Sequence, residues 1–211
     1  MVIQIAKRII ELFPRKRSTN DPFRILICTI LSQRTRDENT EVACQRLFSR
    51  YSDPWTIAEL TPNQLYELIK PSGMYKQKAE RIVKVSRIIA EKYQGRVPSD
   101  LEELLKLPGV GRKTANIVLY HGFGKPALAV DTHVHRISNR IGFVKTKQPE
   151  ETETELGKLI PSELWGPLNG SMVEFGKNLC RPHAPLCNRC PLTNECKFFR
   201  QRKKEDVNQI S

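Results

Sequence analysis

The sequence predicts an all-α protein, on three observations about its apolar residues. Segment 78–93 repeats apolar residues at the spacing of one helix face. Segment 23–31 is too apolar for a surface helix, which indicates a buried central helix. We find no convincing alternation of apolar and polar residues, and the nearest strand candidate, 127–130, is too short.

Each further helix has its own signal. Segment 37–51 turns Val42 and Leu47 inward. Pro62 follows a capping residue, Thr61, and so begins a shorter helix. Residues 99 and 100 can cap a helix over 101–106. Two more helices are expected at 112–120 and from residue 132.

Two details concern charge at the surface. In segment 78–93 the basic residues lie mostly off the apolar face, which predicts a basic outer surface; they are Lys78, Arg81, Lys84 and Arg87. The tail from Lys197 is basic and then polar, so we expect it to fray.

Composition indicates a globular chain with an anionic partner. Its 211 residues suffice for one or two domains, and 39% hydrophobic with 27% charged residues excludes a disordered or fibrous class. Thirty-five Lys and Arg against 23 Asp and Glu leave a net charge of +12. Such a surplus favours nucleic acid first and an acidic membrane surface second.

No apolar run approaches the roughly 20 residues that a membrane helix needs, so no membrane partner is expected. Lys7 and Arg8 interrupt the apolar residues at the start, which argues against a secretory signal. We therefore expect a cytoplasmic location, with nucleoid association in a prokaryote, and the alternative is a nucleus or an organelle. Cysteines there are thiols or metal ligands more often than disulfides, and Cys28 and Cys44 lie in apolar helical surroundings typical of a core.

Four cysteines form the clearest metal signal. Their spacing is C-x6-C-x2-C-x5-C, and they are Cys180, Cys187, Cys190 and Cys196. Four thiolates suit a [4Fe–4S] cluster or a tetrahedral zinc, and the spacing alone does not choose between them. His183 could join a zinc set but is expected on the loop surface. The bland alternative is four ordinary buried cysteines.

A glycine turn between two helices is the first candidate for DNA contact. Leu107-Pro108-Gly109-Val110-Gly111 precedes the helix that begins at Arg112. Backbone N–H groups at a helix N-terminus favour an anion, so Gly109, Gly111 and Arg112 are predicted to bind a DNA phosphate. The alternative is a plain helix–helix turn. Phosphate binding is favoured over a plain turn because segment 106–147 holds eight Lys and Arg against one acid.

Lys113 lies in the first turn of that helix, where a cation is electrostatically out of place. The helix dipole and Arg112 both disfavour the ammonium, and burial would add to this effect. A free amine, and hence a nucleophile, becomes more accessible. The alternative is a solvated surface lysine.

Asp131 is the one acid in this basic stretch. It can cap the helix that follows, or act as a carboxylate that faces a developing positive charge or moves a proton, and both roles can hold together. His133 and His135 follow closely and are expected to cap, pack or contact a phosphate.

These motifs together resemble a known family. Leu107–Leu119 resembles the helix-hairpin-helix of the endonuclease III group, and Ala129-Val130-Asp131-Thr132-His133 is similar to the loop that carries its catalytic Asp. The cysteine spacing is similar to that family's [4Fe–4S] loop. The resemblance spans about residues 22–196, with three motifs in the same order.

The resemblance implies a two-lobed helical fold. One lobe is a helical barrel over 22–130, and the other joins 1–21 to 131–211 and carries the cluster. A substrate groove would lie between the lobes, with Lys113 and Asp131 on opposite walls. The family excises damaged bases from DNA and nicks the abasic site, and its lysine goes with combined glycosylase and lyase activity. Lys113 together with the cluster therefore favours oxidised pyrimidines, and the protein is expected to act as a monomer on double-stranded DNA.

The chain departs from the family pattern in one loop. Where the family often has Leu-Ser-x-Gln-Thr-x-Asp, this chain places Gln33 one residue early and Arg34 in the slot of the gap-filling Gln. Both Gln33 and Arg34 are predicted to contact DNA. Arg can also stack or hydrogen-bond in that gap. Gly73-Met74-Tyr75 resembles the wedge loop, with flexible Met74 in place of the usual Leu.

The resulting hypothesis is a lysine Schiff-base mechanism with Asp131 as the assisting carboxylate. Two other classes compete with it: an architectural DNA-binding module without catalysis, and a small iron–sulfur electron carrier. A carrier has no need of the positive charge, and a module leaves Lys113 and Asp131 unexplained. Within the enzyme class the runner-up is a mismatch-specific thymine or adenine glycosylase, which Lys113 disfavours.

Overall fold

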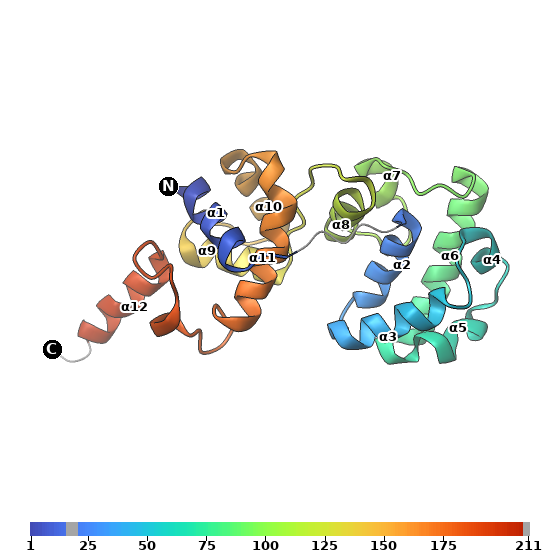
Figure 1. Ribbon diagram of the computed structural model, residues 1–211, viewed down its shortest axis with the longest axis horizontal. Coiled ribbons are helices and arrows are strands. Elements are labelled where there is room, and N and C mark those ends of the chain that lie inside the picture. The colour runs from blue at the N-terminus through green and yellow to red at the C-terminus, as the bar shows by residue number, and fades with distance from the viewer. Residues whose placement is uncertain (16–20, 209–211) are drawn as a thin grey trace. The chain divides into compact units, whose positions relative to one another are not determined.

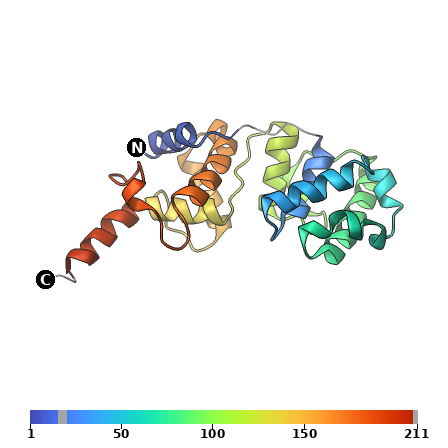
Figure 2. The ribbon, with the colours of Figure 1, turned by 60° about the horizontal axis from the view of Figure 1, so that its bottom comes forward.

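The computed structural model describes residues 1–15 and 21–208, the side chains of 204–208 excepted. Within these residues every regular element is a helix and no strand is present, which confirms the all-α prediction. The chain divides into two compact units, Ser18–Lys125 and Met1–Arg17 with Pro126–Ser211. Figures 1 and 2 show the helices of each unit, coloured along the chain. No described helix combines the length and the apolar character that a membrane span requires.

The unit Ser18–Lys125 is built around a buried helix, α2 (Pro22–Ser32), as the sequence predicts. Helix α2 packs against α3, α6 and α8, and Figure 2 shows α8 beside α2. Asp21 caps α2 by accepting a hydrogen bond from Arg24 N. The other helices of this unit are α3 (Asp37–Phe48), α4 (Pro54–Ala58), α5 (Pro62–Ile69), η1 (Lys70–Ser72), α6 (Tyr75–Tyr93), α7 (Leu101–Leu105) and α8 (Arg112–Phe123).

The second unit joins the N-terminal helix α1 to the last part of the chain. Helix α1 packs on α11, which also contacts α9, and α10 packs on α9 (Figure 1). The elements are α1 (Val2–Leu12), α9 (Thr132–Ile141), α10 (Pro149–Leu159), η2 (Ser162–Leu164), α11 (Trp165–Asn178), η3 (Cys187–Arg189) and α12 (Lys197–Asn208).

The division of the chain differs from the predicted 22–130 by a few residues at each end. Residues 126–130 belong with the N- and C-terminal unit, because Leu128 and Val130 are buried in its core beside α1 and α9. The run Ala127–Val130 is fully buried without forming a strand. Its apolar character therefore reflects core packing.

Four expectations need correction. Val42 of α3 is 39% exposed, although the apolar pattern turned it inward. Lys78 is buried, with 2% of its surface exposed, although the pattern placed it on an outer basic face. Cys28 and Cys44 form a disulfide between α2 and α3, where we expected two core thiols. The segment from Lys197 forms α12, which packs on α9, where we expected a frayed tail.

Candidate functional site

The glycine turn 107–111 is a tight loop that leads into α8. Val110 N donates to Leu107 O at 3.1 Å, and Gly109 adopts φ +75°, a left-handed conformation that favours glycine. A Cβ on Gly109 would also lie 2.1 Å from Arg81 Cδ. Gly111 is different, since a Cβ there would meet nothing within 4 Å. The space beside Gly111 is therefore open to an approaching phosphate.

Lys113 is the second residue of α8 and is exposed. Its backbone is fixed because the next three residues, Thr114, Ala115 and Asn116, are all buried. The burial that the sequence analysis considered for this lysine is absent, because its side chain is exposed. The amine is presented on a rigid first turn and is accessible to a large substrate.

Asp131 is the N-cap of α9, and its side chain is half-buried. Its Oδ1 accepts hydrogen bonds from His133 N and Val134 N, both at 2.9 Å. Among the described residues, Oδ2 has no hydrogen-bond partner. The capping interpretation is confirmed, and the same bonds hold the carboxylate in one orientation with one oxygen left for a substrate.

Lys113 lies in the Ser18–Lys125 unit and Asp131 in the other. That they face each other across a groove stays a prediction. The two histidines after Asp131 are held by neighbours in their own unit. Arg136 Nη2 lies 3.3 Å from His133 Nδ1, and Thr152 Oγ1 lies 2.7 Å from His135 Nδ1. Both are half-buried, as their packing role requires, and a DNA contact by His133 stays a prediction.

The two expected intercalating residues have an unusual backbone. Arg34 adopts φ +53° and Met74 φ +48°, which is uncommon for residues other than glycine. Both side chains are exposed, Met74 to 51%. Strained, exposed residues of this kind occur more often at functional sites. Insertion of these two side chains into DNA stays a prediction.

Gln33 has a different environment from Arg34. Its Nε2 donates to Gly109 O at 3.0 Å, and its Oε1 accepts from Arg81 Nη1 at 2.8 Å. The Gln33 amide is thus engaged within the protein and links its loop to the glycine turn. The one-residue shift of Gln in the sequence therefore corresponds to a difference in structure. Gln33 is held by hydrogen bonds within the protein, whereas Arg34, in the family's Gln slot, is exposed.

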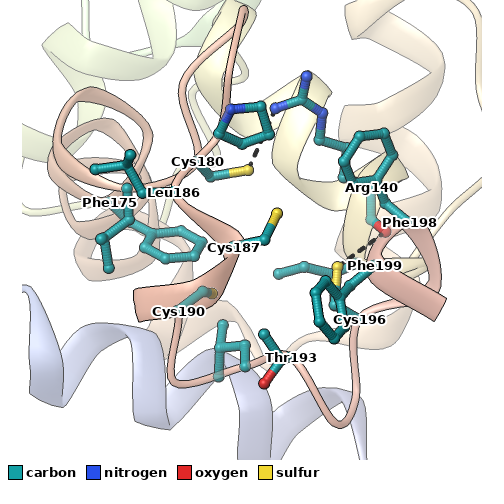
Figure 3. A pocket seen from close by; sticks show the side chains of 14 residues that line it. Arg140, Phe175, Cys180, Leu186, Cys187, Cys190, Thr193, Cys196, Phe198 and Phe199 are labelled. Atoms are coloured by element: carbon teal, nitrogen blue, oxygen red, sulfur yellow. Dashed lines mark hydrogen bonds between the residues drawn. The ribbon is translucent and has the colours of Figure 1, made fainter. Parts of the chain in front are cut away.

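The four cysteines near the C-terminus line one hollow between α11 and α12, which is partly open to solvent. Figure 3 shows the sulfur atoms of Cys180, Cys187 and Cys196 turned toward this space. Apolar side chains complete the lining, among them Phe175, Leu186 and Leu192. We call residues 180–196 the cysteine loop.

Two arginines of α9 hold the start of the cysteine loop. Arg136 Nη2 donates to Cys180 O at 2.9 Å. Arg140 donates to Arg181 O at 2.6 Å and to Pro182 O at 2.7 Å, and its Nη1 lies 3.5 Å from Cys180 Sγ (Figure 3). Arg136 and Arg140 thus fix the start of the cysteine loop to α9.

The cysteine loop fits a group that carries positive charge and several metal atoms. Burial raises the pKa of the Cys190 and Cys196 thiols, so their thiolates need a cation. Within the described residues, no three Cys, His, Asp or Glu side chains converge as ligands of a single ion. A lone zinc requires four sulfur atoms about 4 Å apart, whereas each thiolate of a cluster binds its own iron. The four cysteines line one hollow without converging on a single point, which fits separate bonds from each thiolate to the irons of a cluster.

Several residues of this arrangement are missing from the sequence prediction. Lys78 and Arg81 organise the loops that carry Arg34 and Met74, and Arg136 and Arg140 hold the cysteine loop. A signal for Lys78 exists, because it shares a helix face with the buried Ile82, Val85 and Ile89. No comparable signal marks the arginines, because their acceptors are backbone carbonyls.

A helix-hairpin-helix turn, an exposed lysine after it and a capping Asp are the marks of a DNA repair protein. The family model described as "HhH-GPD superfamily base excision DNA repair protein" matches residues 27–162. The chain is 64% identical to Endonuclease III of Thermotoga maritima over 98% of this chain and 97% of that protein. It is 35% identical to Endonuclease III of Escherichia coli over 96% of this chain and 99% of that protein.

Solved structures agree with this similarity. A "non-covalent Endonuclease III-DNA Complex" superposes with a TM-score of 0.88 at 37% identity, over 96% of this chain and 97% of that chain. A "thermostable thymine-DNA glycosylase" superposes with a TM-score of 0.82 at 26% identity, over 95% of each chain. The chain belongs to the HhH-GPD superfamily and, within it, to the endonuclease III family. It is a DNA glycosylase and abasic-site lyase.

Proposed function

We propose that the protein removes oxidised pyrimidines, such as thymine glycol, from duplex DNA and cleaves the resulting abasic site by β-elimination. The observation that carries this proposal is Lys113, an exposed amine on the rigid first turn of α8, directly after the glycine turn. A nucleophilic amine serves both the glycosylase and the lyase step.

In the proposed reaction, Lys113 Nζ attacks C1′ of the sugar, and the bond from C1′ to the damaged base breaks. Asp131 stabilises the positive charge that develops on the sugar and accepts a proton from the lysine. The sugar ring opens to a Schiff base between Nζ and C1′. Loss of a proton from C2′ then expels the 3′ phosphate, and hydrolysis of the Schiff base restores the amine.

DNA binding is assigned to three loops. The open space beside Gly111 and the first turn of α8 would receive a phosphate, with Gly109 shaping the turn and Arg112 adding charge. Arg34 and Met74 would occupy the space of the extruded nucleotide. Extrusion costs least at a damaged base, which supplies part of the selectivity. One copy of the chain contains all these residues, in keeping with action as a monomer.

A [4Fe–4S] cluster is assigned to the cysteine loop, with Cys180, Cys187, Cys190 and Cys196 as its ligands. When bound, the cluster supplies positive charge that compensates the thiolates and fixes the loop. The loop and the start of α12 then hold Arg181 and Lys197 in place to bind DNA phosphates. No step of the proposed reaction passes through the cluster.

Borohydride trapping tests the proposal. A Schiff base between Lys113 and DNA is reduced to a stable covalent adduct, which is expected on duplexes that carry thymine glycol or a plain abasic site. Lys113→Gln should abolish the adduct on both duplexes while binding of the duplex persists. The matched control is Lys84→Gln, which removes an exposed lysine of α6 and should leave trapping unchanged.

Each other outcome has a defined meaning. An adduct on the abasic duplex alone would retain the lyase and contradict the choice of oxidised pyrimidines. Release of a mismatched thymine or adenine without any adduct would favour the monofunctional glycosylase instead. Full cleavage of both duplexes by Lys113→Gln would overturn the assignment of the nucleophile.

A further inference from the structure

The buried ammonium of Lys78 connects two loops of the Ser18–Lys125 unit. Its Nζ donates to Leu31 O at 2.7 Å, to Thr35 Oγ1 at 2.7 Å and to Ser72 O at 2.8 Å. Thr35 Oγ1 also donates to Ser72 O. The three N–H bonds of one ammonium therefore meet three oxygens, two from the end of α2 and the loop after it, and one from η1.

Arg81, one helical turn further along α6, connects a third loop. Its Nη1 donates to Gln33 Oε1, and Gln33 Nε2 donates to Gly109 O. The Arg81 side chain also lies directly against Gly109, where any Cβ would collide with it. The loop of Gln33 is thus bound to the glycine turn as well as to η1.

The residues next to these contacts are the exposed ones. Arg34 lies between Gln33 and Thr35, whose side chains are both held. Met74 lies two residues after Ser72, whose carbonyl is held, and Met74 O accepts from Lys78 N at 3.1 Å. Arg34 and Met74 both have positive φ. Such conformations persist only where the surroundings enforce them.

A lysine would be an unfavourable residue at an interior position that required only a side chain of the right volume. Burial disfavours its charge, and an apolar side chain of similar volume would often be at least as stable. Lys78 contributes defined geometry, because the three N–H donors on its Nζ fix the positions of three acceptors relative to one another. The position is therefore suited to holding loops in register.

We infer that Lys78 and Arg81 are positioning residues that hold the loops of Arg34 and Met74 and the glycine turn as one rigid DNA-probing unit. This inference rests on the proposed function, because it assigns the two exposed side chains to the extrusion of a nucleotide. Neither Lys78 nor Arg81 touches the reacting atoms. Their loss should impair extrusion of a paired base more than the chemistry on an abasic site, where no base has to be unpaired.

The test compares two variants on two substrates under single-turnover conditions. Lys78→Met removes the ammonium with little change of volume, and Thr35→Val removes the hydroxyl that joins Lys78 to Ser72 and leaves Lys78 in place. Each is measured on a duplex with thymine glycol paired to adenine and on a duplex with an abasic site. Lys84→Met, at an exposed position of the same helix, is the control.

We expect the ratio of the rate on thymine glycol to the rate on the abasic site to fall at least about tenfold in both variants, because a hydrogen bond to a charged group is worth a factor of this size. The ratio of Lys84→Met should equal that of the wild type. Arg81→Met should lower the ratio less, since Gln33 keeps its bond to Gly109. Unchanged ratios in Lys78→Met and Thr35→Val, including a parallel loss of both activities, would overturn the inference.

A second readout is independent of the chemistry. In a Lys113→Gln background, the fluorescence of 2-aminopurine placed opposite the lesion should increase when the protein binds. The reason is that insertion of Arg34 and Met74 into the duplex breaks the stacking of this base. Adding Lys78→Met should reduce this response, and an equal response would overturn the inference. If the wild-type protein formed no covalent adduct with DNA but still increased the fluorescence of 2-aminopurine, the proposed function would be contradicted. The inference about Lys78 and Arg81 would not be contradicted by that result.

Discussion

The loops at the start of α6 and the cysteine loop are both held by cations, but in different ways. Around α6, Lys78 and Arg81 satisfy acceptors on three loops with side chains of the chain itself. In the cysteine loop, Arg136 and Arg140 reach the carbonyls of residues 180–182. The rest of that loop encloses a hollow lined by four cysteines.

This difference teaches how each region reaches its final order. The α6 loops are preorganised by the folded chain, because their donors and acceptors are matched within one unit. The cysteine loop has buried thiols that need a positively charged group. The first region is therefore expected to withstand metal removal and the second is not.

The largest expected effect breaks the cysteine loop. Cys187→Ser should abolish iron binding and lower the free energy of unfolding of its unit by at least about 3 kcal/mol, because metal binding and folding are coupled at such sites. Iron analysis and denaturant unfolding measure both effects. Binding of one zinc and no iron by the wild-type protein would contradict the cluster assignment.

The next effect concerns the disulfide within the Ser18–Lys125 unit. The disulfide between Cys28 and Cys44 closes a loop of sequence separation 16. Such a loop is worth about 3 kcal/mol in the chain-entropy model. Dithiothreitol or Cys28→Ser should therefore lower the free energy of unfolding of the Ser18–Lys125 unit by this amount. An equal number of free thiols with and without reductant, in the unfolded protein, would show that the bridge is absent.

The ionisation of Lys78 makes the stability of the same unit depend on pH. Burial, with help from the charge of Arg81, lowers the pKa of Lys78 from 10.5 to about 8. Between these two values the unfolded chain binds the extra proton, so the free energy of unfolding rises with pH. Relative to Lys78→Met, the wild type should gain about 2–3 kcal/mol from pH 7.5 to pH 10. Urea titrations of both proteins at each pH measure this difference, and a gap that does not change with pH would contradict the burial of the charge.

The smallest effect separates two roles of Asp131. Asp131→Ala should cost about 1 kcal/mol because α9 loses its cap, whereas Asp131→Asn should cost less because Asn also caps helices. Both variants should lose base excision, since neither carries the carboxylate. Thermal unfolding and a base-release assay measure the two roles. Full excision by Asp131→Asn would restrict Asp131 to capping.

The sequence by itself determined the helical class, the glycine turn and the capping position of Asp131. These are local features, set by periodicity, by glycine conformation and by hydrogen bonds to nearby backbone. The position of Arg34 in the family's gap-filling slot was also readable, together with the cysteine spacing. Even the burial of Lys78 had a local signal, because it shares a helix face with Ile82 and Val85.

Only the tertiary structure decided which side chain meets which distant carbonyl. Lys78 donates to Leu31 O across 47 positions of the chain, and Arg140 donates to Arg181 O across 41. Every residue carries the same carbonyl, so no pattern of side chains marks the one that accepts. The pairing of Cys28 with Cys44 belongs here too, because it depends on how α2 and α3 pack. Long-range contacts of this kind follow from packing, which places a donor and an acceptor together irrespective of their separation in sequence.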